Sequence, residues 1–338
     1  MAGLVVIPEP TADEARVGAL VEALEAFGFD VHRTGGEPAV LGAMGVAPDF
    51  DVRHIKVLPG VQDVVRITSP YKFASRTWHP DDTLVDVDGV VVGGDEIVVM
   101  AGPCSVESED QLRAAATAVQ ASGARILRGG VFKPRTSPWS FQGLGLPGLE
   151  LLARIGEELG LPVVTEVMEP SLVPEVARYA DILQIGARNM QNTPLLTAVG
   201  RVDRPVLLKR GAAATVDEWL GAADYILAEG NPDVMLCERG IRTFSQATRN
   251  TLDLSVVPVL RERTHLPVVV DPSHAVGVAR WIPDLAVAAV AAGAHALIVE
   301  VHPDPTVALS DAAQALTPDA FAAMMERVGR VGAALGRH

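Results

Sequence analysis

The chain has little cysteine and a deficit of positive charge. Its 338 residues include only two cysteines, Cys104 and Cys237, so a disulfide framework is excluded and a reducing cytoplasm is the expected compartment. Lysine and arginine number 28 against 42 acidic residues, and the resulting formal charge of −14 repels nucleic acid and anionic membrane surfaces. Neither polyanion is therefore an expected partner.

Long apolar runs are also missing. No stretch approaches the roughly 20 consecutive apolar residues of a membrane span. The amino terminus, MAGLVVIPEP, lacks the basic start and long apolar segment of a secretory signal. Hydrophobic residues nevertheless make up 49% of the sequence, which is enough to bury a large core. We expect a fully folded, soluble, cytoplasmic protein.

The first 70 residues alternate between strand and helix patterns. Strands are predicted at residues 4–8, 29–34, 38–46 and 61–68, with helices over 11–27 and 51–58. The order βαββαβ predicts a ferredoxin-like domain over residues 1–70, with a regulatory role as one interpretation. Residues 71–95 are expected to form a polar connector and a hairpin with an Asp-Gly turn.

Eight apolar strand patterns follow, separated by stretches rich in Ala, Leu and Glu. The first is EIVVMAGPC and the last is HALIVEVHP. Eight successive βα units predict a closed parallel barrel over residues 96–338. The expected fold class is α/β, a (β/α)8 TIM barrel preceded by a ferredoxin-like domain.

Ionisable residues gather at the carboxyl ends of the predicted barrel strands. They are Cys104, Arg128, Glu166, Arg188, Lys209, Glu238 with Arg239, Asp271 with His274, and Glu300 with His302. In a TIM barrel these ends converge on the face that carries the active site. The sequence therefore predicts one site at that face.

Basic residues are concentrated near this face, in an otherwise acidic chain. They are Arg128, Lys133, Arg135, Arg188, Lys209, Arg210, Arg239 and Arg242. So many cations in a partly buried mouth repel one another unless anions neutralise them. We expect a minority to pair with Glu166, Glu238 or Asp271, and the others to bind the phosphate and carboxylate groups of small ligands.

A second group combines one thiol, one imidazole and two carboxylates. It consists of Cys104, His274, Glu300 and Asp311. This mixed set suits a borderline divalent ion such as Mn²⁺, Fe²⁺, Co²⁺ or Zn²⁺ better than Mg²⁺ or Ca²⁺. Each of these residues, taken alone, is explained by core packing or by ion pairing. Only their placement together favours a metal site. His302 is a candidate for supporting a ligand from outside the group.

The segment GLGLPG, residues 143–148, matches the dinucleotide-binding fingerprint letter by letter. No predicted strand directly precedes it, and no βαβ unit with an acidic ribose partner surrounds it. We therefore predict a loop there rather than a nucleotide site.

Eight longer motifs carry a family resemblance. They are AGPCSVES, LRGGVFKPRTSPWSFQGLG, IGARNMQN, LLKRG, CERGIRTF, TRNTLDLSVVPVL, DPSHA, and VEVHPDP with a following LSD. They closely resemble the 3-deoxy-D-arabino-heptulosonate 7-phosphate (DAHP) synthases, in the short type I subfamily related to the 3-deoxy-D-manno-octulosonate 8-phosphate synthases. The resemblance covers nearly the whole chain, although DPSHAVG replaces the DPSHSGG of many members.

The resemblance implies condensation of phosphoenolpyruvate with erythrose 4-phosphate, which opens the shikimate route to aromatic amino acids. It implies four metal ligands, with Mn²⁺ as the expected ion: Cys104, His274, Glu300 and Asp311. It also implies phosphoenolpyruvate contacts at Arg128, Lys133, Arg188, Lys209 and Arg239, and erythrose 4-phosphate contacts at Arg135 and Thr136. The expected catalytic set is Lys133, Cys104, His274 and Glu166, with Lys133 as proton donor to the forming hydroxyl. Glu166 and a metal-bound water are both candidates for activating the water that adds at C2.

Three other functions stay open at this point. One is the sister octulosonate synthase, against which the segment KPRTS argues. The second is a Schiff-base aldolase that uses Lys209, and the third is a non-catalytic sensor of aromatic amino acids. A homo-oligomer, either a tetramer or a dimer, is expected, and a chorismate mutase is a candidate partner.

Overall fold

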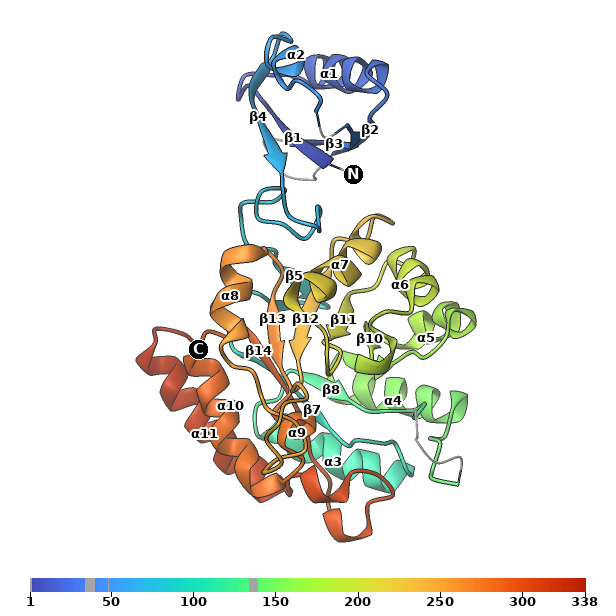
Figure 1. The fold of residues 1–338 in the computed structure, drawn as a ribbon. Coiled ribbons are helices and arrows are strands. Elements are labelled where there is room, and N and C mark those ends of the chain that lie inside the picture. Colours follow the sequence, from blue (N-terminus) through green and yellow to red (C-terminus); the bar gives the residue numbers. More distant parts are fainter. Residues whose placement is uncertain (1, 34–39, 48, 134–138) are drawn as a thin grey trace. The chain divides into compact units, whose positions relative to one another are not determined.

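The structure, a computed structural model, describes residues 2–33, 40–47, 49–133 and 139–338. The chain divides into two compact units, Met1–Asp81 and Asp82–His338 (Figure 1). Among the described helices, none combines the length and the apolar character that crossing a bilayer requires.

The first unit has the predicted βαββαβ order. Its elements are β1 (Ala2–Pro8), α1 (Glu14–Ala26), β2 (Asp30–Arg33), β3 (Leu41–Val46), α2 (Arg53–Lys56) and β4 (Val61–Ile67). The strands form one antiparallel sheet in the order β2-β3-β1-β4. Leu4, Leu20, Leu24 and Ile55 pack between one face of this sheet and the helices. The ferredoxin-like fold is therefore confirmed.

The other face of this sheet is covered by residues of the segment expected to be a connector. Phe73 and Trp78 pack against Val5 and Ile67. Gly42 makes room for this contact, because a Cβ atom at that position would lie 1.9 Å from Cζ3 of Trp78. The first unit consequently extends to Asp81, and the segment after residue 70 forms part of its core.

The second unit is a closed barrel of eight parallel strands. They are β7 (Val98–Gly102), β8 (Ile126–Arg128), β9 (Val163–Glu166), β10 (Ile182–Ile185), β11 (Val206–Lys209), β12 (Val234–Glu238), β13 (Val268–Val270) and β14 (Ala296–Glu300). Pairing of β14 with β7, with Ala296 opposite Val98, closes the ring. The predicted TIM barrel is confirmed.

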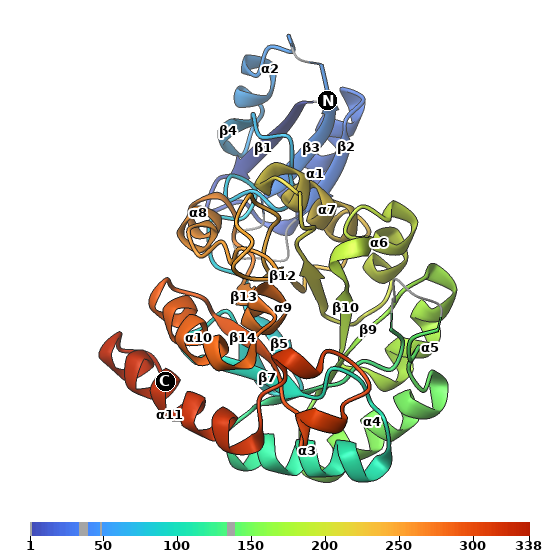
Figure 2. The same ribbon diagram turned by 60° about the horizontal axis from the view of Figure 1, so that its bottom comes forward.

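Helices surround the strand ring (Figures 1 and 2). They are α3 (Glu109–Ala121), α4 (Leu146–Leu159), α5 (Val173–Tyr179), α6 (Thr193–Gly200), α7 (Val216–Leu227), α8 (Val256–Arg263), α10 (Ile282–Ala291) and α11 (Pro318–Ala334). Short helical turns lie at Pro170–Leu172, Ala187–Asn189, Ala279–Trp281, Pro305–Val307 and Ala312–Gln314. The segment DPSHAVG forms the short helix α9 (Pro272–Val276), with Ala275 and Val276 buried.

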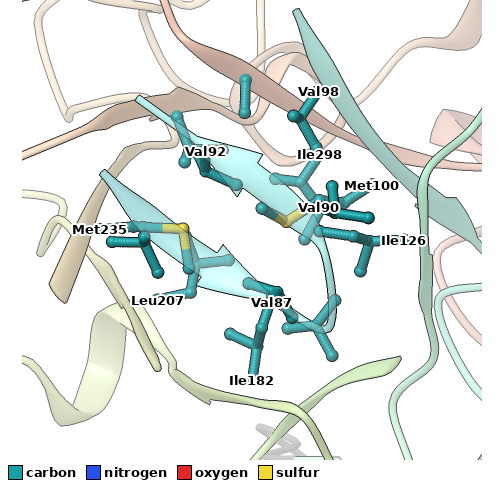
Figure 3. Packing of buried hydrophobic residues seen from close by; sticks show 14 of the residues in the cluster. Val87, Val90, Val92, Val98, Met100, Ile126, Ile182, Leu207, Met235 and Ile298 are labelled. Carbon is teal, nitrogen blue, oxygen red and sulfur yellow. The ribbon is translucent and has the colours of Figure 1, made fainter. Parts of the chain in front are cut away.

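A hairpin, β5 (Val85–Val87) and β6 (Val90–Val92), precedes the barrel. Its turn is the expected Asp-Gly pair, in which Asp88 and Gly89 both have positive φ as the tight turn requires. Its inward valines join one apolar cluster with side chains near the amino ends of the barrel strands (Figure 3). The barrel contributors include Val98, Met100, Ile126, Ile182, Leu207, Met235 and Ile298. The hairpin thus closes that end of the barrel.

We expect Val87→Ala to lower the free energy of unfolding of the second unit by about 2 kcal/mol, because it removes buried methyl groups and leaves a cavity. Urea denaturation measures this change. Val91→Ala is the matched control, since Val91 lies on the other face of the same hairpin and is only partly buried. Equal losses for the two variants would contradict the closure of the barrel by the hairpin.

Candidate active site and metal centre

The carboxyl ends of the barrel strands surround a cavity of about 670 Å³. Arg128, Glu166 and Lys209 are the last residues of β8, β9 and β11, and each lines the cavity. Further lining residues are Lys133, Arg188, Arg239, Arg242, Arg249, Asn250, His274 and Asp311. Of the residues predicted at the strand ends, these six line one cavity: Arg128, Glu166, Arg188, Lys209, Arg239 and His274. Cys104, Glu238, Asp271, Glu300 and His302 are not part of its lining.

The four predicted metal ligands lie together. Cys104, His274, Glu300 and Asp311 each offer one ligand atom, and these atoms all lie within 4.8 Å of one another. Nε2 of His274 is 3.2 Å from Oε1 of Glu300, and Sγ of Cys104 is 3.2 Å from Oδ2 of Asp311. Sulfur, nitrogen and carboxylate oxygen in one cluster are donors that suit a borderline divalent metal.

His274 is oriented by the buried carboxylate of Asp271. Nδ1 of His274 lies 2.7 Å from Oδ2 of Asp271, and the backbone N–H of His274 donates to Oδ1. A carboxylate only accepts, so Nδ1 carries the proton and the lone pair of Nε2 faces the cluster. Burial lowers the pKa of His274 despite the neighbouring charges of Asp271 and Glu300. Burial thus favours the neutral ring, which is the form that binds a metal.

Both carboxylate oxygens of Glu300 are held. Oε1 accepts from Nη1 of Arg128 at 2.8 Å, and Oε2 accepts from Nε2 of Gln314 at 2.6 Å. Burial opposes ionisation of Glu300, but interactions with His274, Arg128 and Lys133 outweigh it and lower its pKa to about 2. The sequence analysis did not predict Gln314 as a site residue. Its position three residues after Asp311 was the only feature of the sequence that pointed to the site.

Lys133 contacts Cys104 directly. Its Nζ donates to the backbone oxygen of Cys104 at 2.9 Å and to Sγ at 3.0 Å. Burial, reinforced by the charge of Glu300, raises the pKa of the Cys104 thiol to about 12. Burial opposes the charge of Lys133, yet Cys104 and Glu300 raise the pKa of its ammonium group. Without a metal, the pair is a neutral thiol beside a cation.

Cations outnumber acids around the cavity. Among the residues that the structure describes, its lining includes seven arginine and lysine side chains but only two carboxylates, Glu166 and Asp311. Nζ of Lys209 donates to Asp271 at 2.6 Å. Nε of Arg128 is buried and has no hydrogen-bond partner in the described part of the chain. The cavity therefore suits a ligand that carries more than one negative charge.

Arg210 lies away from the cavity that Lys209 lines. It is buried, and its Nη1 pairs with Glu238 at 3.0 Å and with Asp253 at 2.9 Å. Side chains of adjacent residues in a strand point to opposite sides. This alternation predicts that Lys209 and Arg210 face different surroundings. The expected pairing of a minority of the cations thus occurs at Arg210 with Glu238 and at Lys209 with Asp271.

Arg249 is a site residue that sequence reasoning missed. Its Nη1 donates to Oε1 of Gln314 at 2.8 Å and lies 3.6 Å from Oδ1 of Asp311. It lies in the long connection after β12. No strand or helix pattern there indicates in which direction its side chain points. Gln314 consequently links Arg249 to Glu300.

Glu166 reaches the cavity because its neighbour has no side chain. A Cβ atom at Gly186 would lie 2.0 Å from Oε1 of Glu166. The backbone of Gly186, with φ −66 and ψ 155, is one that any residue adopts. Glycine at position 186 therefore provides space for this carboxylate. It does not supply a backbone conformation that only glycine adopts.

Two of the predicted contacts, Arg135 and Thr136, lie outside the described residues. The segment 143–148 was predicted to be a loop, which is wrong for its second half. Leu146, Pro147 and Gly148 form the first turn of α4, where a proline fits because its missing N–H is not needed.

The chain matches two family models. Residues 76–334 match the DAHP synthetase I family, and residues 4–69 match the DAHP synthase ferredoxin-like domain. The chain belongs to the DAHP synthetase I family. The resemblance inferred from the motifs is thereby confirmed.

Similar proteins support this assignment. A phospho-2-dehydro-3-deoxyheptonate aldolase of Thermotoga maritima is 45% identical over 334 residues, which is 98% of this chain and 99% of that protein. A crystal structure of the Thermotoga maritima enzyme, described as a DAHP synthase, has a TM-score of 0.80 at 44% identity and covers 100% of this chain and 99% of that chain. A 2-dehydro-3-deoxyphosphooctonate aldolase of Nitrobacter hamburgensis is 35% identical over 266 residues, 72% of this chain and 91% of that protein.

We expect inorganic phosphate to raise Tm by several degrees, because an anion that binds only the folded cavity stabilises it. Differential scanning fluorimetry in phosphate, against chloride of equal ionic strength, measures the shift. Arg239→Ala should reduce the shift, whereas Arg201→Ala, on the exposed surface beside Glu229, should not. Equal effects of phosphate and chloride would contradict an anion site.

Proposed function

We propose that this chain is a DAHP synthase, which condenses phosphoenolpyruvate with D-erythrose 4-phosphate and water to give DAHP and inorganic phosphate. The observation that carries the proposal is one cavity that combines the cluster of Cys104, His274, Glu300 and Asp311 with an excess of cations. Membership of the family supports it. The likeness to the Thermotoga maritima aldolase spans nearly the whole chain, whereas the octulosonate aldolase matches a shorter part at lower identity.

The cations would hold phosphoenolpyruvate in place. Arg128, Lys209 and Arg239 offer donors to its phosphate and carboxylate groups, and Arg128 retains a buried Nε for this purpose. Each charge-assisted hydrogen bond contributes about 1.5–3 kcal/mol. Arg188 lines the same cavity from the turn Ala187–Asn189. Fixing both substrates in attack geometry supplies a large share of the rate gain.

The four-residue cluster fits a divalent metal, for which we propose Mn²⁺. Burial lowers the pKa of its imidazole, the pKa of Glu300 is low, and the thiol of Cys104 would release its proton when a metal binds. When bound, the ion would polarise the aldehyde of erythrose 4-phosphate as a Lewis acid.

Lys133 is the proposed general acid. Its ammonium lies at hydrogen-bond distance from Sγ of Cys104, beside the metal cluster. The aldehyde oxygen becomes a hydroxyl when C3 of phosphoenolpyruvate attacks, and it needs one proton. A raised pKa keeps Lys133 protonated and able to donate at neutral pH.

Glu166 is the proposed base for the water that adds at C2. Attack by C3 leaves positive character at C2 of phosphoenolpyruvate, and addition of water there precedes loss of phosphate. Glu166 presents its carboxylate to the cavity, at the end of β9. A carboxylate in this position accepts the proton that the water loses.

We propose a cytoplasmic homo-oligomer, either a tetramer or a dimer, in which the first unit senses aromatic amino acids. A chorismate mutase is the proposed protein partner. Activity measured with and without tyrosine and phenylalanine tests the regulatory role directly, and insensitivity to both would leave the first unit as a subunit contact.

We expect the enzyme to release phosphate from phosphoenolpyruvate and erythrose 4-phosphate in the presence of Mn²⁺, and to stop when a chelator removes the metal. A phosphate-release assay with erythrose 4-phosphate or arabinose 5-phosphate measures the preference. Faster turnover of arabinose 5-phosphate would favour the octulosonate synthase. Full activity in the chelated enzyme would contradict the metal centre, and borohydride trapping at Lys209 would indicate a Schiff-base aldolase.

We expect Gly186→Ala to lower kcat at least about tenfold, because a general base usually contributes more than this to the rate. The new methyl group would displace the carboxylate of Glu166, while the backbone accepts alanine, so Tm should change little. Gly94→Ala is the control, because a Cβ atom there meets nothing within 4 Å. An unchanged kcat in Gly186→Ala would argue against Glu166 as the base.

A further inference from the structure

Asp311 has an unusual backbone conformation for a metal ligand. Its φ of 45 and ψ of 36 lie in the left-handed region. In the described part of the chain, the only other non-glycine residue with positive φ is Asp88, in the tight turn of the β5–β6 hairpin. A strained backbone of this kind persists only where its surroundings hold it. Contacts from neighbouring loops hold Asp311 in this conformation.

Apolar packing does little for the loop that leads to Asp311. This loop follows β14 and contains the short turn Pro305–Val307. The side chains of Val307 and Leu309 are 65% and 53% exposed. Burial of apolar surface, the dominant stabilising contribution elsewhere in the barrel, is therefore small here.

Glu107, from the loop after β7, contacts this loop at two points. Its Oε1 accepts the backbone N–H of Leu309 at 2.8 Å, two residues before Asp311. Its Oε2 lies 3.4 Å from Nε2 of His302, at the start of the same loop. One carboxylate thus joins both ends of the loop to the strand that leads to Cys104.

The hydrogen bonds of His302 fix its tautomer. The backbone N–H of Asp304 donates to Nδ1 at 3.1 Å, so the neutral ring carries its proton on Nε2. That N–H faces the carboxylate of Glu107, which only accepts. His302 is buried, with 4% of its surface exposed. Donors and acceptors therefore match at every atom of the contact.

A second contact lies next to the ligands themselves. The hydroxyls of Ser105 and Ser310 are 2.5 Å apart and both residues are buried. Ser105 directly follows Cys104, and Ser310 directly precedes Asp311. The contact therefore connects the two ligand-bearing loops at the positions adjacent to the ligands.

We propose that Glu107 is a positioning residue for the metal centre: it holds the loop after β14 so that Asp311 faces Cys104, His274 and Glu300. It acts through Leu309 and His302 and contributes no ligand atom of its own. His302 and the Ser105–Ser310 contact complete the same support. The inference rests on the proposed metal centre, and it assigns to Glu107 a role in metal affinity rather than in substrate binding.

The test measures Mn²⁺ binding by calorimetry on full-length protein freed of metal with a chelator. Glu107→Ala should raise the Kd for Mn²⁺ about 10- to 100-fold, the range seen when supporting hydrogen bonds around a metal are removed. The KM for phosphoenolpyruvate at saturating Mn²⁺ should change less than about twofold, because Glu107 does not line the cavity. A merely structural role would leave the Kd of the folded protein unchanged.

Two further variants sharpen the test. Glu107→Gln keeps an oxygen for the N–H of Leu309 but places an amide N–H against Nε2 of His302, so its Kd should lie between those of the wild type and Glu107→Ala. Thr306→Ala is the matched control, because in the described contacts Thr306 bonds only to Asp304 in the exposed part of the loop. Its Kd should equal that of the wild type.

The outcomes separate this inference from the proposed function. If the wild-type protein does not bind Mn²⁺, the metal centre itself is wrong. If the wild type binds Mn²⁺ and Glu107→Ala binds it equally well, only the inference is overturned. Should Glu107→Ala fail to fold by circular dichroism, Ser310→Ala replaces it, with an increased Kd expected and an unchanged Kd contradicting the role of the support.

Discussion

The carboxylate of Asp271 joins the two halves of the active site. Its Oδ2 lies 2.6 Å from Nζ of Lys209 and 2.7 Å from Nδ1 of His274. Burial opposes a charge on Asp271, but His274 and Lys209 bring its pKa well below the ordinary value. Breaking such a buried pair leaves an uncompensated charge and costs about 3–5 kcal/mol. The proposed metal ligand His274 and the proposed substrate-binding residue Lys209 therefore both contact a single oxygen atom.

A series of polar contacts runs through the rest of the site. Arg128 pairs with Glu300, whose other oxygen accepts from Gln314, and Gln314 in turn accepts from Arg249. Internal pairing accounts for Glu300 and Asp271, whereas the described lining of the cavity keeps more cations than carboxylates. A bound anion would offset this excess of positive charge.

Sequence patterns predicted what depends on regular structure. The alternation of strands and helices predicted both units, and strand ends predicted the positions of Arg128, Glu166 and Lys209. Asp311 lies beyond any strand end; its joint placement with Cys104, His274 and Glu300 suggested a ligand, and the family resemblance strengthened that prediction. Contacts made by loops could not be predicted, since the left-handed backbone at Asp311 has no periodic signal. Glu107, Arg249 and Gln314 were missed for this reason.

The hairpin of β5 and β6 has a consequence for how molecules move through the enzyme. Its valines fill the amino end of the barrel with close-packed side chains, and such a core has no passage wide enough for a sugar phosphate. Both substrates, the product sugar acid and the released phosphate must then use the same opening at the carboxyl ends of the strands. In each catalytic cycle, substrates enter and products leave through this one opening. Slow release of a product therefore delays binding of the next substrate.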